Sequence, residues 1–297
     1  MIVRDRPSRW DLLFAVRGSM VLVVAPRIGF LMAVATIMVA LNAYLGPFPQ
    51  VDGSGFTVFG IALSLFLGFR NNAAYDRWWE ARKLWGGLLA DLRSLARDVQ
   101  IFVPDEKLRT GLLRLALAFL HLHRTSLRRI EDDGQACEWA PELCAGPRQT
   151  ACSALDRIAE RIAEGHRRGL IEGFGARVLS AQLTSMAAQQ AGSERIANTP
   201  LPYAYSLAIY RTTYLYCLLL PLALIAHSGW MTPVFVGIVA YMFLALAEVS
   251  EELSHPFGKT PNALPLDAIC RAAEISLAPH LGLKPPPPLA PHNFYLS

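Results

Sequence analysis

Residues 53–79, GSGFTVFGIALSLFLGFRNNAAYDRWW, are the most informative part of this chain about its fold. Its first 17 residues carry no charged side chain, and a helix needs about 20 mainly apolar residues to cross the hydrocarbon of a bilayer. No proline follows, and apolar and aromatic residues recur at helical spacing past Arg70 to Trp78 and Trp79. The stretch therefore predicts a membrane-spanning helix that continues without a break where it leaves the membrane.

Two more uncharged stretches predict the remaining spans. Residues 28–51 form one of them, and residues 212–247 form another that is too long for a single span. His227, Ser228 and Gly229 mark a turn near the middle of the longer stretch, which predicts a helical hairpin. We therefore expect an all-α membrane protein with four transmembrane helices, at about residues 28–46, 54–72, 205–226 and 232–253.

The rest of the chain predicts a helical region outside the membrane. Residues 73–204 and 254–283 carry helix-spaced apolar residues, with Asp105 as a plausible cap after Pro104, and strand signals are weak. We expect residues 1–283 to form one folded unit in which the spans are continuous with this region. Residues 284–297 include four consecutive prolines and predict an extended tail.

The basic residues predict the orientation. Only 18% of residues are charged, fewer than the roughly 25% of soluble domains, and 20 of the 28 Lys and Arg residues lie between Arg70 and Arg211. The short connections 46–55 and 227–232 contain none. The N-terminal segment contains five arginines: Arg4, Arg6, Arg9, Arg17 and Arg27. Because basic loops stay in the cytoplasm, both termini and the helical region are expected on the cytoplasmic side of a multi-pass membrane protein.

Several classes of function find no support in the sequence. Nucleotide-binding, hydrolase and zinc-protease motifs are absent, so we predict neither an enzyme nor a cofactor. The basic residues do not alternate with aromatic residues, which argues against nucleic acid. Five cysteines without a C-x-x-C pair argue against a disulfide framework. His121 and His123 could join Cys137 and Cys144 around a metal, but the spacing fits no zinc site and we expect surface or interfacial histidines instead.

An acidic cluster and an apolar stripe remain as candidate sites. Glu248, Glu251 and Glu252 follow the last span, together with His255, and we favour ion pairing with arginines over cation binding or catalysis. In the second span, Ile61, Leu65 and Phe69 are four residues apart and share one helix face, beside the small residues Gly60, Ser64 and Gly68. The stripe could pack against a helix or lipid, or it could form an apolar constriction of a pore.

Three ordered motifs resemble the bestrophin family, specifically its bacterial branch. The first is residues 61–72 followed by Asp76-Arg77-Trp78-Trp79. The second is Glu194-Arg195-Ile196-Ala197-Asn198-Thr199-Pro200-Leu201-Pro202. The third is Glu248-Val249-Ser250-Glu251-Glu252-Leu253, followed by Pro256-Phe257-Gly258 and Leu264-Pro265-Leu266-Asp267. The resemblance spans nearly the whole chain, up to about Leu281.

The resemblance implies a homopentameric ion channel of the bacterial inner membrane, with the four spans of each subunit arranged around a five-fold axial pore. Ile61, Leu65 and Phe69 fall on its apolar neck, and Leu179 is the best candidate for a second, cytoplasmic aperture. Its partners would be further copies of itself, the lipid bilayer and monovalent ions, with a slight preference for cations and chloride as the other possibility. A membrane-anchored scaffold or enzyme is the alternative.

The calcium clasp of animal bestrophins has no counterpart here. The animal proteins carry an acidic run after the Pro-Phe-Gly, whereas this chain has Lys259-Thr260-Pro261-Asn262-Ala263. Calcium requires several oxygen ligands, preferably carboxylates, and Asp267 alone does not supply them. We therefore predict no bound metal and no calcium gating at this position.

Overall fold

The computed structural model describes residues 1–3, 10, 18–46, 48, 51–130, 133–143 and 150–297. Cys144 and all N-terminal arginines except Arg27 lie outside these residues. The described residues are helical or irregular, with only isolated β-bridges and no strand. This confirms the all-α prediction. The chain divides into two compact units, one built from residues 4–78 and 200–255 and the other from residues 1–3, 79–199 and 256–297.

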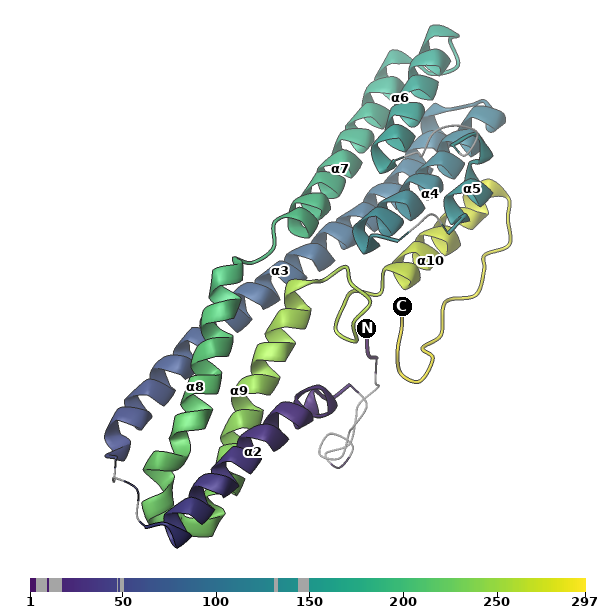
Figure 1. The fold of residues 1–297 in the computed structure, drawn as a ribbon. Coiled ribbons are helices and arrows are strands. Elements are labelled where there is room, and N and C mark those ends of the chain that lie inside the picture. Colours follow the sequence, from purple (N-terminus) through teal and green to yellow (C-terminus); the bar gives the residue numbers. More distant parts are fainter. Residues whose placement is uncertain (4–9, 11–17, 47, 49–50, 131–132, 144–149) are drawn as a thin grey trace. The chain divides into compact units, whose positions relative to one another are not determined.

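The first unit, called the span unit here, contains the apolar helices (Figure 1). These are α2 (Val21–Tyr44), the first half of α3 (Gly53–Phe102), α8 (Tyr203–Ser228) and α9 (Thr232–Ser254), and a short 3-10 turn, η2 (Gly229–Met231), joins α8 to α9. By length and hydropathy, the stretches Val21–Tyr44, Gly53–Phe102 and Tyr203–Ser254 can each cross a membrane. The last stretch consists of α8, η2 and α9, as the turn at Gly229 predicted. The first helix begins seven residues before the predicted Ile28 and carries Pro26 and Arg27 within it.

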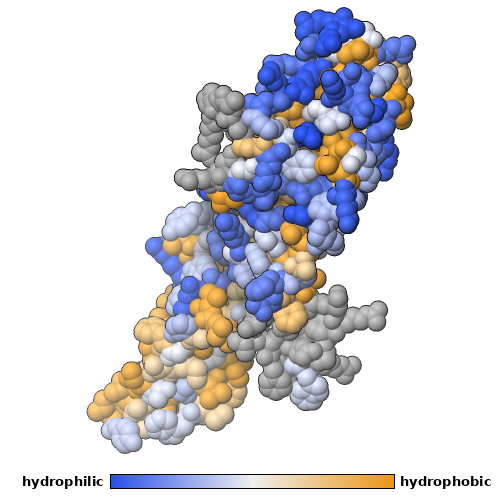
Figure 2. Space-filling model, turned by 90° about the vertical axis from the view of Figure 1, so that its right-hand side faces the viewer, coloured by the Kyte–Doolittle hydropathy of each residue, from blue (hydrophilic) through white to orange (hydrophobic). Residues whose placement is uncertain are grey.

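Helices α2, α8 and α9 pack against one another, and their shared core includes one residue of α3. Leu31 on α2, Leu63 on α3, Cys217 on α8 and Val236 on α9 belong to this buried cluster. Many large apolar side chains point outward instead, and Figure 2 shows hydrophobic residues gathered over this part of the visible face. An apolar exterior of this size is typical of a surface that meets lipid or other membrane helices.

The second unit, called the helical unit here, is built around α4 (Glu106–Arg128). It also contains the second half of α3, α5 (Gln135–Trp139), η1 (Pro141–Leu143), α6 (Ala151–Arg167), α7 (Gly173–Asn198), α10 (Leu266–Leu277) and η3 (Ala278–Leu281). Asp105 caps α4 by accepting a 2.7 Å hydrogen bond from the Leu108 amide, as predicted. Every residue from Leu115 to Thr125 is buried, so this stretch of α4 is enclosed on all sides.

His121 and His123 lie inside this core, which corrects the expectation that they are surface or interfacial residues. The His123 ring stacks between Trp85 and Phe119, and burial lowers its pKa to about 3. His121 Nε2 lies 2.9 Å from a carboxylate oxygen of Glu274. No group of three potential metal ligands occurs among the described residues.

Two other features of the helical unit bear on the sequence analysis. Cys137 is disulfide-bonded, although the cysteine pattern predicted no disulfide framework, and Cys152, Cys217 and Cys270 are free. The tail beyond Leu283 has little regular structure, yet its end is held: the Leu296 amide donates to the Met1 carbonyl and the Ala268 amide to the Ser297 carbonyl. The tail is thus an extended segment whose last residues are docked.

Candidate pore helix and its polar supports

In the span unit, α3 has one buried face and one open face. Ile61, Leu65 and Phe69 are 66%, 56% and 55% exposed, while Leu63 and Leu67 on the other face are buried. Leu67 packs with Ile209 of α8 and Ala247 of α9. The predicted stripe therefore exists as an apolar surface of the single chain, and no described residue of the span unit covers it.

The parallel stripe of small residues has a more limited role than predicted. A Cβ added to Gly60 would lie 2.7 Å from the Tyr216 hydroxyl, so here α8 approaches α3 closely. At Gly68 a Cβ would meet nothing within 4 Å, and Ser64 donates its hydroxyl to the Gly60 carbonyl of its own helix. Of these three residues, only Gly60 lies at a close contact between two helices of the described chain.

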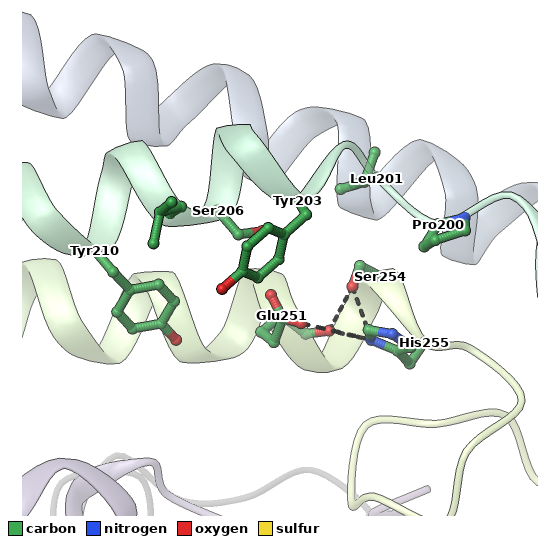
Figure 3. Close-up of a pocket in the computed structure, with 9 residues that line it drawn as sticks. Pro200, Leu201, Tyr203, Ser206, Tyr210, Glu251, Ser254 and His255 are labelled. Atoms are coloured by element: carbon green, nitrogen blue, oxygen red, sulfur yellow. Dashed lines mark hydrogen bonds and ion pairs between the residues drawn. The ribbon is translucent and has the colours of Figure 1, made fainter.

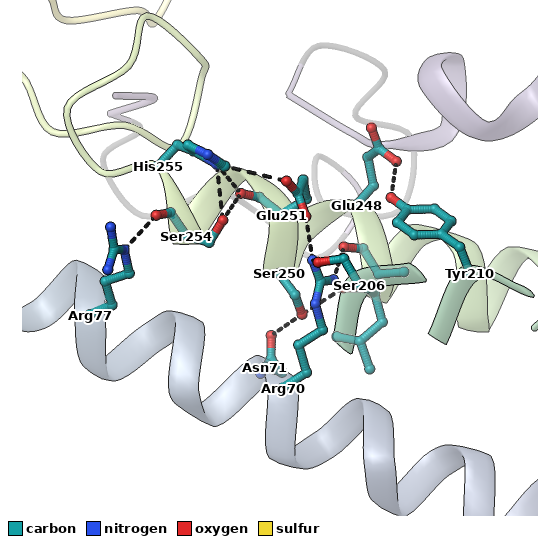
Figure 4. Close-up of polar contacts among 12 residues, drawn as sticks. Arg70, Asn71, Arg77, Ser206, Tyr210, Glu248, Ser250, Glu251, Ser254 and His255 are labelled. Atoms are coloured by element: carbon teal, nitrogen blue, oxygen red, sulfur yellow. Dashed lines mark hydrogen bonds and ion pairs between the residues drawn. The ribbon is translucent and has the colours of Figure 1, made fainter. Parts of the chain in front are cut away.

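Arg70, one residue after Phe69, anchors α3 to α8 and α9 (Figure 4). Its side chain is fully buried and forms an ion pair with Glu251. It also donates hydrogen bonds to the Ala247 carbonyl at 3.0 Å and to the Ser206 hydroxyl at 3.1 Å. A buried guanidinium in a membrane helix is costly unless it is paired, so this residue fixes its helix to both neighbours.

Two further polar contacts join α3 to α9 beyond Arg70 (Figure 4). Ser250 donates its hydroxyl to the Asn71 side-chain oxygen at 3.1 Å, and Arg77 Nε donates to the Ser254 carbonyl at 2.7 Å. With the Arg70 contacts they form a ladder of about two helical turns. The ladder fixes the rotation of α3 about its own axis, and therefore fixes which face carries the stripe.

The acidic cluster at the end of α9 is largely engaged by arginines. Glu248 pairs with Arg27 of α2 at 3.0 Å and accepts a 2.9 Å hydrogen bond from the Tyr210 hydroxyl. Glu251 pairs with Arg70. These arginines come from α2 and α3, and the favoured ion pairing is confirmed for Glu248 and Glu251. Sequence analysis did not identify Arg70 as a site residue, although a charged residue at the end of an apolar run is a signal that could have found it.

Leu179 is fully buried within α7 of the helical unit. A side chain that lines an aperture must face the conduit, and Leu179 faces the core of its own unit. Arg177 and Ser180, on the neighbouring positions of α7, are exposed instead. The predicted second constriction is therefore not placed at Leu179, because helix packing turns that residue inward.

The segment that would correspond to a calcium clasp is engaged by the chain termini. The Ile2 amide donates to the Pro261 carbonyl at 2.9 Å, and the Tyr295 hydroxyl to the Lys259 carbonyl at 3.3 Å. Asp267 pairs with Arg124 and Arg128. Burial opposes ionisation of Asp267, but hydrogen bonds from Ser297 and the two arginines lower its pKa to about 2. The charge of its carboxylate is therefore already neutralised by arginines of the protein.

Comparisons with known proteins agree with this geometry. The profile of the family described as Bacterial/Fungal Bestrophin protein matches residues 1–279. The chain is 44% identical over 301 residues to the voltage-dependent anion channel-forming protein mll4386 of Mesorhizobium japonicum, covering 100% of this chain and 97% of that protein. It is 39% identical over 287 residues to the voltage-dependent anion channel-forming protein YneE of Escherichia coli, covering 93% of each.

A solved structure shares the fold. The crystal structure of a bacterial bestrophin homologue from Klebsiella pneumoniae superposes with a TM-score of 0.81 at 30% sequence identity, covering 88% of this chain and 100% of that one. The names of the two sequence relatives describe channel-forming proteins, not enzymes. The family match covers all three motifs singled out in the sequence and most of both compact units. This chain therefore belongs to the bestrophin family, in its bacterial and fungal branch.

Proposed function

We propose that this protein is the subunit of a homopentameric channel that conducts monovalent ions through an axial pore lined by α3. The observation that carries the proposal is the exposed stripe of Ile61, Leu65 and Phe69 on α3. The opposite face of this helix packs against α8 and α9 and is held there by the hydrogen bonds of Arg70. A single chain cannot enclose a conduit with one helix face. Five copies around an axis would turn the stripe inward and cover it.

The stripe has the chemistry of a hydrophobic gate. Its three side chains extend over about 12 Å along the helix axis, at 1.5 Å per residue. A narrow ring of such side chains excludes water unless it widens. It also offers ions no replacement for their hydration shell. A neck of this kind carries no fixed charge, so it should favour weakly hydrated ions and leave the sign of the permeant ion to charges elsewhere along the conduit.

Both of these relatives, mll4386 and YneE, are named as anion channel-forming proteins. The resemblance to the bacterial branch slightly favoured cations, and the apolar neck supports permeant ions of either sign. Chloride is therefore the first permeant ion to test. We also propose that the protein lies in the bacterial inner membrane with both termini in the cytoplasm, because 20 of its 28 basic residues lie between Arg70 and Arg211.

The test is ion flux through purified protein in liposomes, with the reversal potential measured under a potassium chloride gradient. We expect flux in the wild type and a larger flux when Ile61, Leu65 and Phe69 are all replaced by Ala. Met242→Ala, which removes an exposed apolar side chain of α9, is the matched control and should leave flux unchanged. The sign of the reversal potential assigns anions or cations.

The absence of flux in both the wild type and the triple variant would refute the channel. The alternative, a membrane-anchored scaffold or enzyme, predicts no axial symmetry. Particle images of the detergent-solubilised protein distinguish the two, because a monomer or dimer cannot form the proposed pore.

A further inference from the structure

A pocket of about 530 Å³ opens in the span unit between the first turns of α8 and the last turns of α9 (Figure 3). Its polar and aromatic lining residues are Tyr203, Ser206, Tyr210, Glu251, Ser254 and His255. Pockets of roughly 300–1,000 Å³ with a few convergent polar groups are the usual size of small-molecule sites. The ion-pair network of α3 and α9 does not fill this space.

Only one of the two carboxylate oxygens of Glu251 is hydrogen-bonded to another described residue. One oxygen of Glu251, Oε2, pairs with Arg70. The other, Oε1, lies 3.8 Å from His255 Nδ1, beyond hydrogen-bond distance, and accepts no hydrogen bond from the residues that the structure describes. The Glu251 side chain is 40% exposed and lines the pocket, so a molecule in the pocket can reach this carboxylate.

Two phenol rings come from the α8 side of the same pocket. Tyr203 and Tyr210 project from α8 on the side that faces Glu251, with Ser206 between them in the sequence (Figure 3). Tyr210 is held in place by its hydrogen bond to Glu248, whereas Tyr203 is 78% exposed and has no hydrogen bond within the described part of the chain. The face of an aromatic ring attracts a cation, and most strongly an organic cation that sheds water easily.

From this arrangement we infer that the pocket binds an organic ammonium group, with Glu251 Oε1 as its counter-ion and the rings of Tyr203 and Tyr210 as its cation–π partners. Pro200, Leu201 and Leu207 complete the lining and would contact the carbon skeleton of the ligand. The same chemistry is offered by a free alkylammonium compound and by the ethanolamine headgroup of a lipid.

Other classes of ligand fit the pocket less well. An anion would find no lysine or arginine among the lining residues. Calcium would need six to eight oxygen ligands, and the lining contains one carboxylate. An apolar ligand would leave the exposed oxygen of Glu251 without a partner.

A single ion pair, Glu251 with Arg70, connects the pocket to the proposed neck. An ammonium on Glu251 Oε1 shares the carboxylate that neutralises Arg70, and Arg70 follows Phe69 directly. We therefore expect occupancy to change flux. This consequence rests on the proposed function, whereas the binding itself does not.

The experiment measures choline binding by calorimetry to the full-length protein in nanodiscs of phosphatidylglycerol, which has no amine. The neutral isostere 3,3-dimethyl-1-butanol is the control ligand, with the same shape and no charge. We expect saturable choline binding and at least tenfold weaker binding of the isostere. Equal affinity for the two compounds, or no saturable choline binding, would overturn the proposal, including the case in which another copy of the chain fills the pocket.

Substitutions locate the site. Tyr203→Ala should weaken choline binding about two- to tenfold, while Tyr203→Phe, which keeps the ring, should retain it. Glu251→Gln should weaken it at least tenfold, and Glu252→Gln, which changes the adjacent carboxylate outside the pocket lining, should have no effect. Glu251→Gln also removes the charge that neutralises Arg70. If Glu251→Gln does not fold, the choline affinity of Tyr203→Ala decides whether the site is assigned correctly. Unchanged affinity in Tyr203→Ala would overturn the assignment.

A second binding measurement distinguishes a free ammonium compound from a lipid headgroup as the natural ligand. In nanodiscs of phosphatidylethanolamine, a weaker apparent affinity for choline identifies the lipid headgroup as a competing occupant, and an unchanged affinity identifies a free ammonium compound. Flux is then measured with and without choline. Binding without any flux would refute the proposed channel and leave the site, whereas flux without choline binding would refute the site alone.

Discussion

The guanidinium of Arg70 on α3 is fully buried and is neutralised by Glu251 on α9, which is itself 40% exposed (Figure 4). The pair joins the helix that carries the apolar stripe to the helix that lines the pocket, and it lies one residue beyond Phe69. Charges buried in this way hold a helix in one rotational setting, because any other setting leaves a charge without a partner.

Loss of the Glu251 charge should destabilise the span unit. Glu251→Ala leaves Arg70 buried without its counter-ion, and we expect a loss of about 3 kcal/mol in the free energy of unfolding, the low end for buried pairs because Glu251 is partly exposed. Chemical denaturation in detergent measures this. The double variant Arg70→Met, Glu251→Leu should recover most of the loss, and a double variant as unstable as the single one would contradict the assignment.

The two faces of α3 should respond differently to truncation. Leu67→Ala removes a buried side chain between α8 and α9, and we expect it to lower the free energy of unfolding by about 2–5 kcal/mol. Leu65→Ala should cost less than about 1 kcal/mol in the isolated subunit, because its side chain is exposed there. In the assembled channel, Leu65→Ala should raise flux. Equal losses of stability at both positions would contradict the orientation of α3.

Gly60 and Gly68 should also differ. Gly60→Ala places a methyl group against the Tyr216 hydroxyl, and Tyr216 is held by Phe59 and Phe243, so the variant should be destabilised by about 1–3 kcal/mol. Gly68→Ala meets no neighbour and should gain up to about 1 kcal/mol from helix propensity. Adding Tyr216→Phe to Gly60→Ala removes the clashing oxygen and should restore stability. Thermal unfolding of the four proteins provides the comparison.

The buried imidazole of His123 should make the helical unit sensitive to acid. Its pKa is lowered from 6.5 to about 3 in the folded protein because of burial, so below pH 6.5 the unfolded chain binds a proton that the folded one does not. Its contribution to stability is present above pH 6.5 and falls by about 1.4 kcal/mol per pH unit between pH 6.5 and about 3. Unfolding measured across this range in His123→Phe should show a shallower slope than in the wild type.

His123→Phe should also be tolerated at neutral pH. Both ring nitrogens are buried without a hydrogen-bond partner in the described residues, so an apolar ring of similar shape loses no bond between Trp85 and Phe119. His227→Gln, which changes an exposed histidine, should leave the pH dependence as it is in the wild type. An unchanged slope in His123→Phe would contradict the role assigned to burial.

Patterns in the sequence predicted the spans, the hairpin at Gly229, the Asp105 cap and the unbroken passage of α3 from apolar to polar surroundings. These features depend on the length of apolar runs, on turn residues and on capping, which act between near neighbours in the chain. The three family motifs, at residues 61–79, 194–202 and 248–267, were also visible in the sequence. The apolar stripe was visible as a spacing of four residues, but the spacing alone did not say what it faced.

Which residues are buried followed from the tertiary structure and not from the sequence patterns. It buried Leu179, which the family resemblance had assigned to an aperture, and it placed His121 and His123 in a core. It paired Arg70 with a glutamate 181 residues away and left one oxygen of that glutamate open to a pocket. Burial and pairing depend on which distant helix packs against a given face, and helical periodicity specifies a face without specifying its neighbour.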